Sequence, residues 1–79
     1  MKNKSNNDFQ QYLKLMGSNL QKERVCQGFT QEKLAEMCNI DYKYYQRIES
    51  GEVNITIKTL YKLSESLKID PIKLFVKED

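Results

Sequence analysis

Residues 42–47 concentrate side chains that can hydrogen-bond to the edges of DNA bases: Tyr42, Lys43, Gln46 and Arg47. Lys43 and Arg47 can donate to O6 and N7 of guanine, and Gln46 can pair with adenine. Tyr42 can pack on a thymine methyl group or donate to a phosphate. On a helix these four positions share one face, because residues three and four apart are neighbours. The spacing predicts a polar helical face suited to the major groove; the alternative is an ordinary solvated surface.

Two short helices joined by a tight turn, within residues 30–51, would carry this face. Thr30 and Asp41 are expected to cap them, because each side chain can accept a hydrogen bond from an otherwise unpaired N–H of the first turn. Gly51 ends the second helix, since glycine adopts the left-handed conformation without penalty. The apolar residues expected to hold the two helices to the core are Leu34, Ala35, Cys38, Tyr45 and Ile48.

The segment resembles the helix-turn-helix of the lambda-repressor-like family, also called the XRE or Cro/C1 type. The resemblance covers about residues 16–75. The matching motif residues are Gln31, Leu34, Ala35, Ile40, Ile48, Glu49 and Gly51, preceded by Arg24, Gly28 and Thr30. The later matches are Ile57, Leu60, Leu63, Leu67, Ile69 and Phe75. This resemblance implies an all-α, compact five-helix DNA-binding domain that inserts its second motif helix into the major groove.

The remaining patterns supply the other three helices. Asp8 is expected to cap a first helix that runs to about Cys26, with residues 1–7 as a flexible tail and residues 8–79 as one domain. Thr56 would cap a helix over residues 57–67, and Pro71 at N1 would open a short last helix that ends near Phe75. The buried stripe expected on the fourth helix is Ile57, Leu60, Leu63 and Leu67.

Further site roles follow from these positions. Tyr44 could donate to a phosphate, as could Asn54, Thr56 and Lys58 around the start of the fourth helix. The resemblance implies a phosphate contact for Gln31 and a partly buried ion pair between Arg24 and Glu49 that locks the second motif helix to the first helix. Asp41 stays open between two roles: a cap only, or also a filter that accepts from a cytosine amino group.

Composition restricts the classes of function. The 79 residues carry a net charge of +2, with 39% hydrophobic and 30% charged residues, as in a small globular helical domain. There is no histidine, and the two cysteines, Cys26 and Cys38, are too few for a disulfide scaffold. We therefore expect no enzyme activity, no metal and no cofactor. Without a signal peptide or an apolar run of transmembrane length, we expect a cytoplasmic protein with no membrane partner.

A DNA-binding domain of this size contacts few bases, so we expect two copies to bind two half-sites about 34 Å apart. The surface expected to form the homodimer comprises Tyr61, Leu67, Ile72 and Phe75. The sub-family resemblance is to controller proteins of restriction–modification systems, which regulate their own promoters as activators and repressors; activation would add RNA polymerase as a partner. The alternatives are a stand-alone phage-type repressor and, from another class, an antitoxin-like interaction protein.

Overall fold

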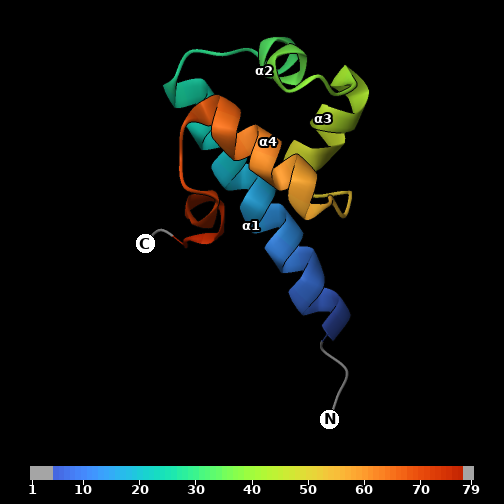
Figure 1. Ribbon diagram of the computed structural model, residues 1–79. Helices are drawn as coiled ribbons and strands as arrows, with labels where there is room; N and C mark the ends of the chain where they lie inside the picture. Colours follow the sequence, from blue (N-terminus) through green and yellow to red (C-terminus); the bar gives the residue numbers. More distant parts are fainter. Residues whose placement is uncertain (1–4, 78–79) are drawn as a thin grey trace.

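The computed structural model describes residues 5–77, which form four α-helices and one 3-10 helix (Figure 1). The helices are α1 (Ser5–Cys26), α2 (Gln31–Cys38), α3 (Tyr42–Glu49), α4 (Ile57–Leu67) and η1 (Pro71–Phe75). The prediction of five α-helices is therefore wrong in its last element. Asp70 does cap η1, by accepting from the Ile72 N–H at 3.0 Å, but the Lys73 N–H bonds three residues back and the chain is already extended at Val76. A five-residue segment closed in this way is a 3-10 turn.

The first helix begins earlier than predicted. It starts at Ser5, so Asp8 lies in its first turn and is not its cap. An acidic residue is favourable there as well, because the N-terminal end of a helix carries partial positive charge. Residues 5–7 thus belong to the helix, whereas residues 1–4 of the predicted tail lie outside the described part of the chain.

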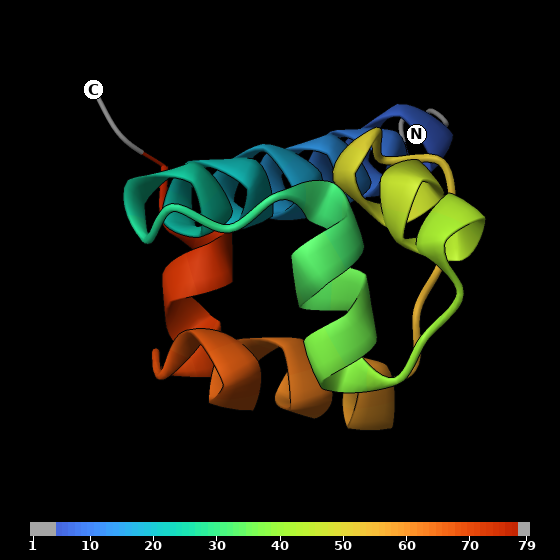
Figure 2. The same cartoon turned by 90° about the horizontal axis from the view of Figure 1, so that it is seen from above.

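Seen from above, α1 and α4 lie on opposite sides of the domain, with α2 and η1 between them and α3 at one end (Figure 2). The space between these helices is filled by apolar side chains from all of them, including Leu20, Leu34, Tyr45, Leu63 and Leu74, each with none of its surface exposed. The N-terminal part of α1 projects beyond the other helices (Figure 1), in line with a longest dimension of 43 Å. None of the helices between residues 5 and 77 has the length and apolar character needed to cross a membrane.

Two predictions on α4 need correction. Ile57, expected in its buried stripe, has 78% of its surface exposed because it is the first residue of the helix, beyond the reach of the core. Leu67 is only 1% exposed, which confirms its place in the buried stripe and shows that its assignment to a dimer surface is wrong. It faces the core from the last turn of the helix, so it cannot contact a second copy.

Candidate nucleic-acid interface

The caps of the two motif helices form as predicted. The Thr30 hydroxyl accepts from the Lys33 N–H and the Asp41 carboxylate from the Tyr44 N–H, both at 3.0 Å. The turn between the helices passes through Asn39, which adopts a left-handed conformation (φ 56°). Asparagine tolerates this conformation better than most residues, so Asn39 marks the turn in the sequence as well. Gly51 follows α3 with φ 74°, as expected of the residue that ends it.

The inner face of α3, defined here as Tyr45, Ile48 and Glu49, is bound into the domain. The side chains of Tyr45 and Ile48 are fully buried, and the Glu49 side chain is 5% exposed. A helix of eight residues is too short to be stable alone in water, so this burial is what holds α3 in place.

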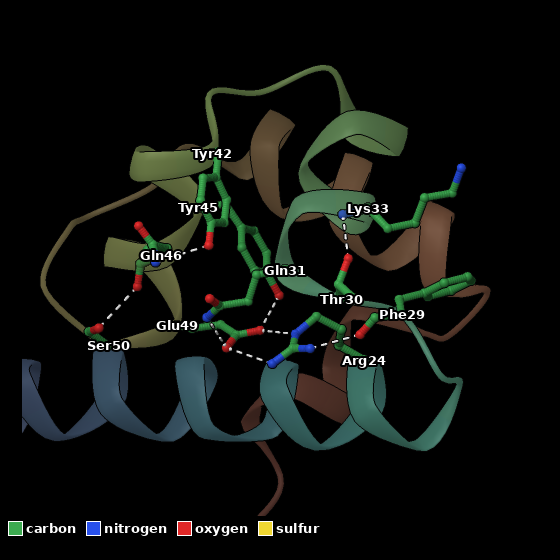
Figure 3. A network of polar contacts seen from close by, with 10 residues as sticks. All are labelled: Arg24, Phe29, Thr30, Gln31, Lys33, Tyr42, Tyr45, Gln46, Glu49 and Ser50. Atoms are coloured by element: carbon green, nitrogen blue, oxygen red, sulfur yellow. Dashed lines mark hydrogen bonds and ion pairs between the residues drawn. The ribbon is translucent and has the colours of Figure 1, made fainter.

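Glu49 pairs with Arg24 of α1, as the family resemblance implied (Figure 3). Nε of Arg24 lies 2.6 Å from Oε2 of Glu49, and a second guanidinium nitrogen lies 3.3 Å from Oε1. The remaining guanidinium nitrogen donates to the carbonyl oxygen of Phe29 at 2.7 Å. Hydrogen bonding to Glu49 raises the pKa of the Arg24 guanidinium above its usual value. The pair thus joins α3 to α1 and to the segment that leads into α2.

Two more donors reach the same carboxylate. The hydroxyl of Tyr45 donates to Oε2, and the amide of Gln31 donates to Oε1 at 2.9 Å. Burial, and next the bond to Glu49, raise the pKa of Tyr45 well above its usual value. The ring of Tyr45 lies in the core, as predicted, and its hydroxyl bonds to Glu49 within the domain. The spacing of Tyr45 and Glu49, one helical turn apart, was the available signal.

A glycine allows the close contact of α3 with α1. A Cβ built on Gly17 would lie 2.7 Å from the Ile48 carbonyl oxygen and closer still to that of Glu49. Real Cβ atoms essentially never approach backbone oxygens so closely, so only glycine fits here. Helical propensity disfavours glycine at this position, and the packing against α3 explains its presence.

The outer face of α3 carries the predicted base readers. Tyr42, Lys43 and Arg47 are exposed, and Gln46 is partly so. Two contacts order them: the Gln46 amide donates to the Tyr42 hydroxyl at 3.3 Å, and Arg47 lies 3.6 Å from the carboxylate of Glu52. Asp41 is exposed and caps the helix. Its cap role is thus confirmed, and base filtering stays a prediction.

The predicted phosphate contacts flank this face. Gln31 is the first residue of α2 and half-buried; Tyr44 is half-buried and packs against the core. Asn54, Thr56 and Lys58 are exposed at the start of α4, where Thr56 caps the helix by accepting from the Thr59 N–H at 3.1 Å. All five remain predictions as phosphate ligands.

Helix α4 and the C-terminal segment 71–77 present apolar side chains outside the core. Tyr61, Ile72 and Phe75 are 56%, 70% and 40% exposed. The buried amide of Asn19 on α1 donates to the carbonyl oxygens of Leu74 and Val76, each at 3.0 Å, and so fastens this segment to α1. The sequence reading missed Asn19, because nothing in its neighbourhood indicates a partner 55 residues away.

Residues 30–51 of this all-α domain therefore form a helix-turn-helix, the DNA-binding class, with a polar face on its second helix. The model of the HTH_3 helix-turn-helix family matches residues 20–74. The chain belongs to this XRE-like family and is an HTH-type DNA-binding transcriptional regulator, in a family without enzymatic activity.

Individual relatives resemble the chain over most of its length. It is 33% identical over 66 residues to the uncharacterized HTH-type transcriptional regulator y4dJ of Sinorhizobium fredii, covering 84% of this chain and 86% of the relative. It is similar to the restriction–modification controller protein C.AhdI of Aeromonas hydrophila (33% identity, TM-score 0.77, 80% and 96% of the two chains). It is also similar to the controller protein C.Esp1396I (32% identity, TM-score 0.73, 86% and 96%).

Proposed function

We propose that the chain binds a specific operator as a homodimer, with α3 of each copy in the major groove of one half-site. The observation that supports this most is the contrast within α3. Its inner face is buried and ion-paired to α1, while its outer face carries four side chains that can hydrogen-bond, Tyr42, Lys43, Gln46 and Arg47. The residues proposed to read bases are Asp41, Tyr42, Lys43, Gln46 and Arg47. A helix held so firmly can present them in a constant register.

Phosphate contacts on both sides of α3 would set this register. Gln31 and Tyr44 are proposed to hold one backbone strand, and Asn54, Thr56 and Lys58 the other. Contacts of this kind position a protein on the duplex without reading its sequence. With a net charge of only +2, affinity depends on a few such contacts more than on a general positive field.

The second copy is proposed to pack on Tyr61, Ile72 and Phe75. Tyr61 lies on α4 and the other two on η1, and exposed apolar side chains are typical of protein–protein contacts where they form a patch. Asn19 supports this assignment, because it holds the segment that carries Phe75 against the rigid helix α1.

The proposed biological role is that of a controller protein that acts at its own promoter in the cytoplasm. The similarity to two controller proteins of restriction–modification systems, at 33% and 32% identity, supports it. The second candidate is a stand-alone phage-type repressor, which would use the same helix-turn-helix on an unrelated operator; the antitoxin-like reading has no observation in its favour.

The test is binding to the DNA upstream of the chain's own coding sequence, with a shuffled duplex of equal composition as control. Fluorescence anisotropy should show tighter binding to the upstream DNA, and footprinting should show two protected half-sites about 10 base pairs, or a multiple of this, apart. Equal affinity for the two duplexes would reject the controller role. Operators selected from random DNA would then show whether specific binding survives.

Dimerisation is tested separately by analytical ultracentrifugation. Phe75→Asp should sediment as a monomer at concentrations where the wild type is a dimer. Met37→Asp on α2 is the matched control, because Met37 is also 40% exposed but lies outside the proposed interface. A dimer that persists in Phe75→Asp would place the interface elsewhere.

A further inference from the structure

Side chains of three helices meet at the Glu49 carboxylate. Its Oε2 accepts from Arg24 and from the Tyr45 hydroxyl, and its Oε1 accepts from Arg24 and from the Gln31 amide (Figure 3). The ion pair with Arg24 accounts for the stability of the contact between α1 and α3. It does not account for the other two donors, one of which comes from a residue at the DNA-facing end of α2.

Gln31 is the member of this group that reaches the surface. It opens α2 and is half-buried, and Figure 3 shows its side chain extending towards Glu49 on α3. A primary amide has two N–H donors, and the bond to Glu49 uses one of them. The second can donate to a phosphate at the N-terminal end of α2, where the helix dipole also favours an anion.

Tyr45 and Arg24 together orient the carboxylate of Glu49, with Arg24 contacting both oxygens and Tyr45 contacting Oε2. Tyr45 precedes Glu49 by one turn of the same helix, and its fully buried ring has no room to move. The bond from its hydroxyl adds a second donor to Oε2 beside Arg24, while Oε1 accepts from Gln31 as well as from Arg24. An aliphatic residue at this position would fill the core equally well but could not make this bond.

We propose that Tyr45 is a positioning residue for DNA binding: acting through Glu49, its hydroxyl fixes the Gln31 amide in the orientation that contacts a phosphate. The inference rests on the proposed function, because it takes Gln31 as a phosphate ligand. Its physical basis is preorganisation, since a glutamine side chain ordered before binding loses less conformational entropy when DNA arrives.

The experiment is a double-mutant cycle in DNA affinity with Tyr45→Phe, Gln31→Ala and the double variant. Phenylalanine retains the buried ring, so the fold should be kept, and thermal unfolding would verify this. Tyr45→Phe should weaken binding by about threefold to tenfold, the range for one hydrogen bond. The loss should be equal on a selected operator and on a shuffled duplex, because a phosphate contact carries no sequence information. In the Gln31→Ala background, Tyr45→Phe should have no further effect.

Tyr44→Phe is the matched control, since it removes a hydroxyl from the neighbouring residue without touching Glu49. In the double variant of Tyr44→Phe and Gln31→Ala, the fold-losses in DNA affinity of the two single variants should multiply. If Tyr45→Phe binds like the wild type, or if its effect also multiplies with that of Gln31→Ala, the positioning role is rejected while operator binding by α3 stands. If Gln31→Ala alone has no effect, the phosphate contact and the positioning role both fail. If the wild type does not prefer any selected operator, the proposed function itself fails.

A measurement without DNA gives an independent answer. In NMR spectra the side-chain amide of Gln31 should show slow exchange and well-separated proton shifts in the wild type. Both features should move towards free-glutamine values in Tyr45→Phe. An unchanged Gln31 amide would contradict the inference whatever the affinities show.

Discussion

The inner and outer faces of α3 differ in what holds their side chains. On the inner face, Glu49 is 5% exposed and bonds to residues of α1, α2 and its own helix. On the outer face, Arg47 makes one ion pair at 3.6 Å with Glu52, and both side chains are more than half exposed. The inner face therefore sets the position of the helix, and the outer face is free to carry whichever side chains an operator requires.

This division explains how a helix of eight residues can keep a fixed position while its outer side chains stay exposed. The inner contacts are buried, where removing one partner of a charged pair is costly. The outer contacts are solvated, where an ion pair contributes about 1 kcal/mol or less. Substitutions on the two faces should consequently separate stability from DNA recognition.

The largest expected effect is that of Glu49→Ala on the inner face. It leaves the Arg24 guanidinium buried without its carboxylate and should lower the free energy of unfolding by about 3–5 kcal/mol. Urea denaturation measures this. Glu52→Ala, which breaks the exposed pair with Arg47, is the control and should cost about 1 kcal/mol at most. Similar losses in the two variants would remove the distinction between the faces.

Gly17→Ala tests the contact of the inner face with α1. Helical propensity alone would make alanine more stable by about 1 kcal/mol. The carbonyl oxygens of Ile48 and Glu49 occupy the space of the new methyl group, so we expect destabilisation by about 1–3 kcal/mol. Ser18→Ala, at the exposed next position, should not destabilise. A stabilised Gly17→Ala variant would show that α3 can move away from α1 at little cost.

Arg47→Ala should act on recognition and leave stability nearly unchanged. If Arg47 reads a guanine, its loss should cost about 1–3 kcal/mol on the operator and much less on random DNA. Lys58→Ala is the comparison, because the loss of a phosphate contact should weaken binding to the operator and to random DNA alike. It should also reduce the slope of log affinity against log salt concentration by about one. Equal losses on both kinds of DNA for Arg47→Ala would reassign it to the phosphate backbone.

The smallest expected effect is alkaline destabilisation through Tyr45. In the unfolded chain the tyrosine hydroxyl loses its proton with a pKa near 10. In the folded state the pKa of Tyr45 is raised, so the hydroxyl stays protonated at higher pH. The stability from this group is complete below about pH 10 and declines above it, by about 1.4 kcal/mol at pH 11. Thermal unfolding at pH 8 and pH 11 should show a larger loss for the wild type than for Tyr45→Phe. Equal losses would mean that the hydroxyl is not held in the core.

Local sequence was sufficient for most of the elements. The caps Thr30, Asp41 and Thr56 and the helix end at Gly51 depend on residues a few positions apart. Where local rules failed, position in the tertiary structure decided. Ile57 follows the apolar period of α4 but lies beyond the core. The same period placed Leu67 correctly in the buried stripe, and only its assignment to a dimer surface was wrong.

The sequence by itself determined the helix-turn-helix and the polar side chains of its second helix, because periodicity, capping and helical neighbours are local properties. Only the tertiary structure decided that Gly17 touches the α3 backbone, that Asn19 fastens the C-terminal segment, and that Tyr45 and Gln31 share the carboxylate of Glu49. These contacts join residues that no local pattern relates, mostly on different helices. They depend on where each helix packs, which is a property of the whole core.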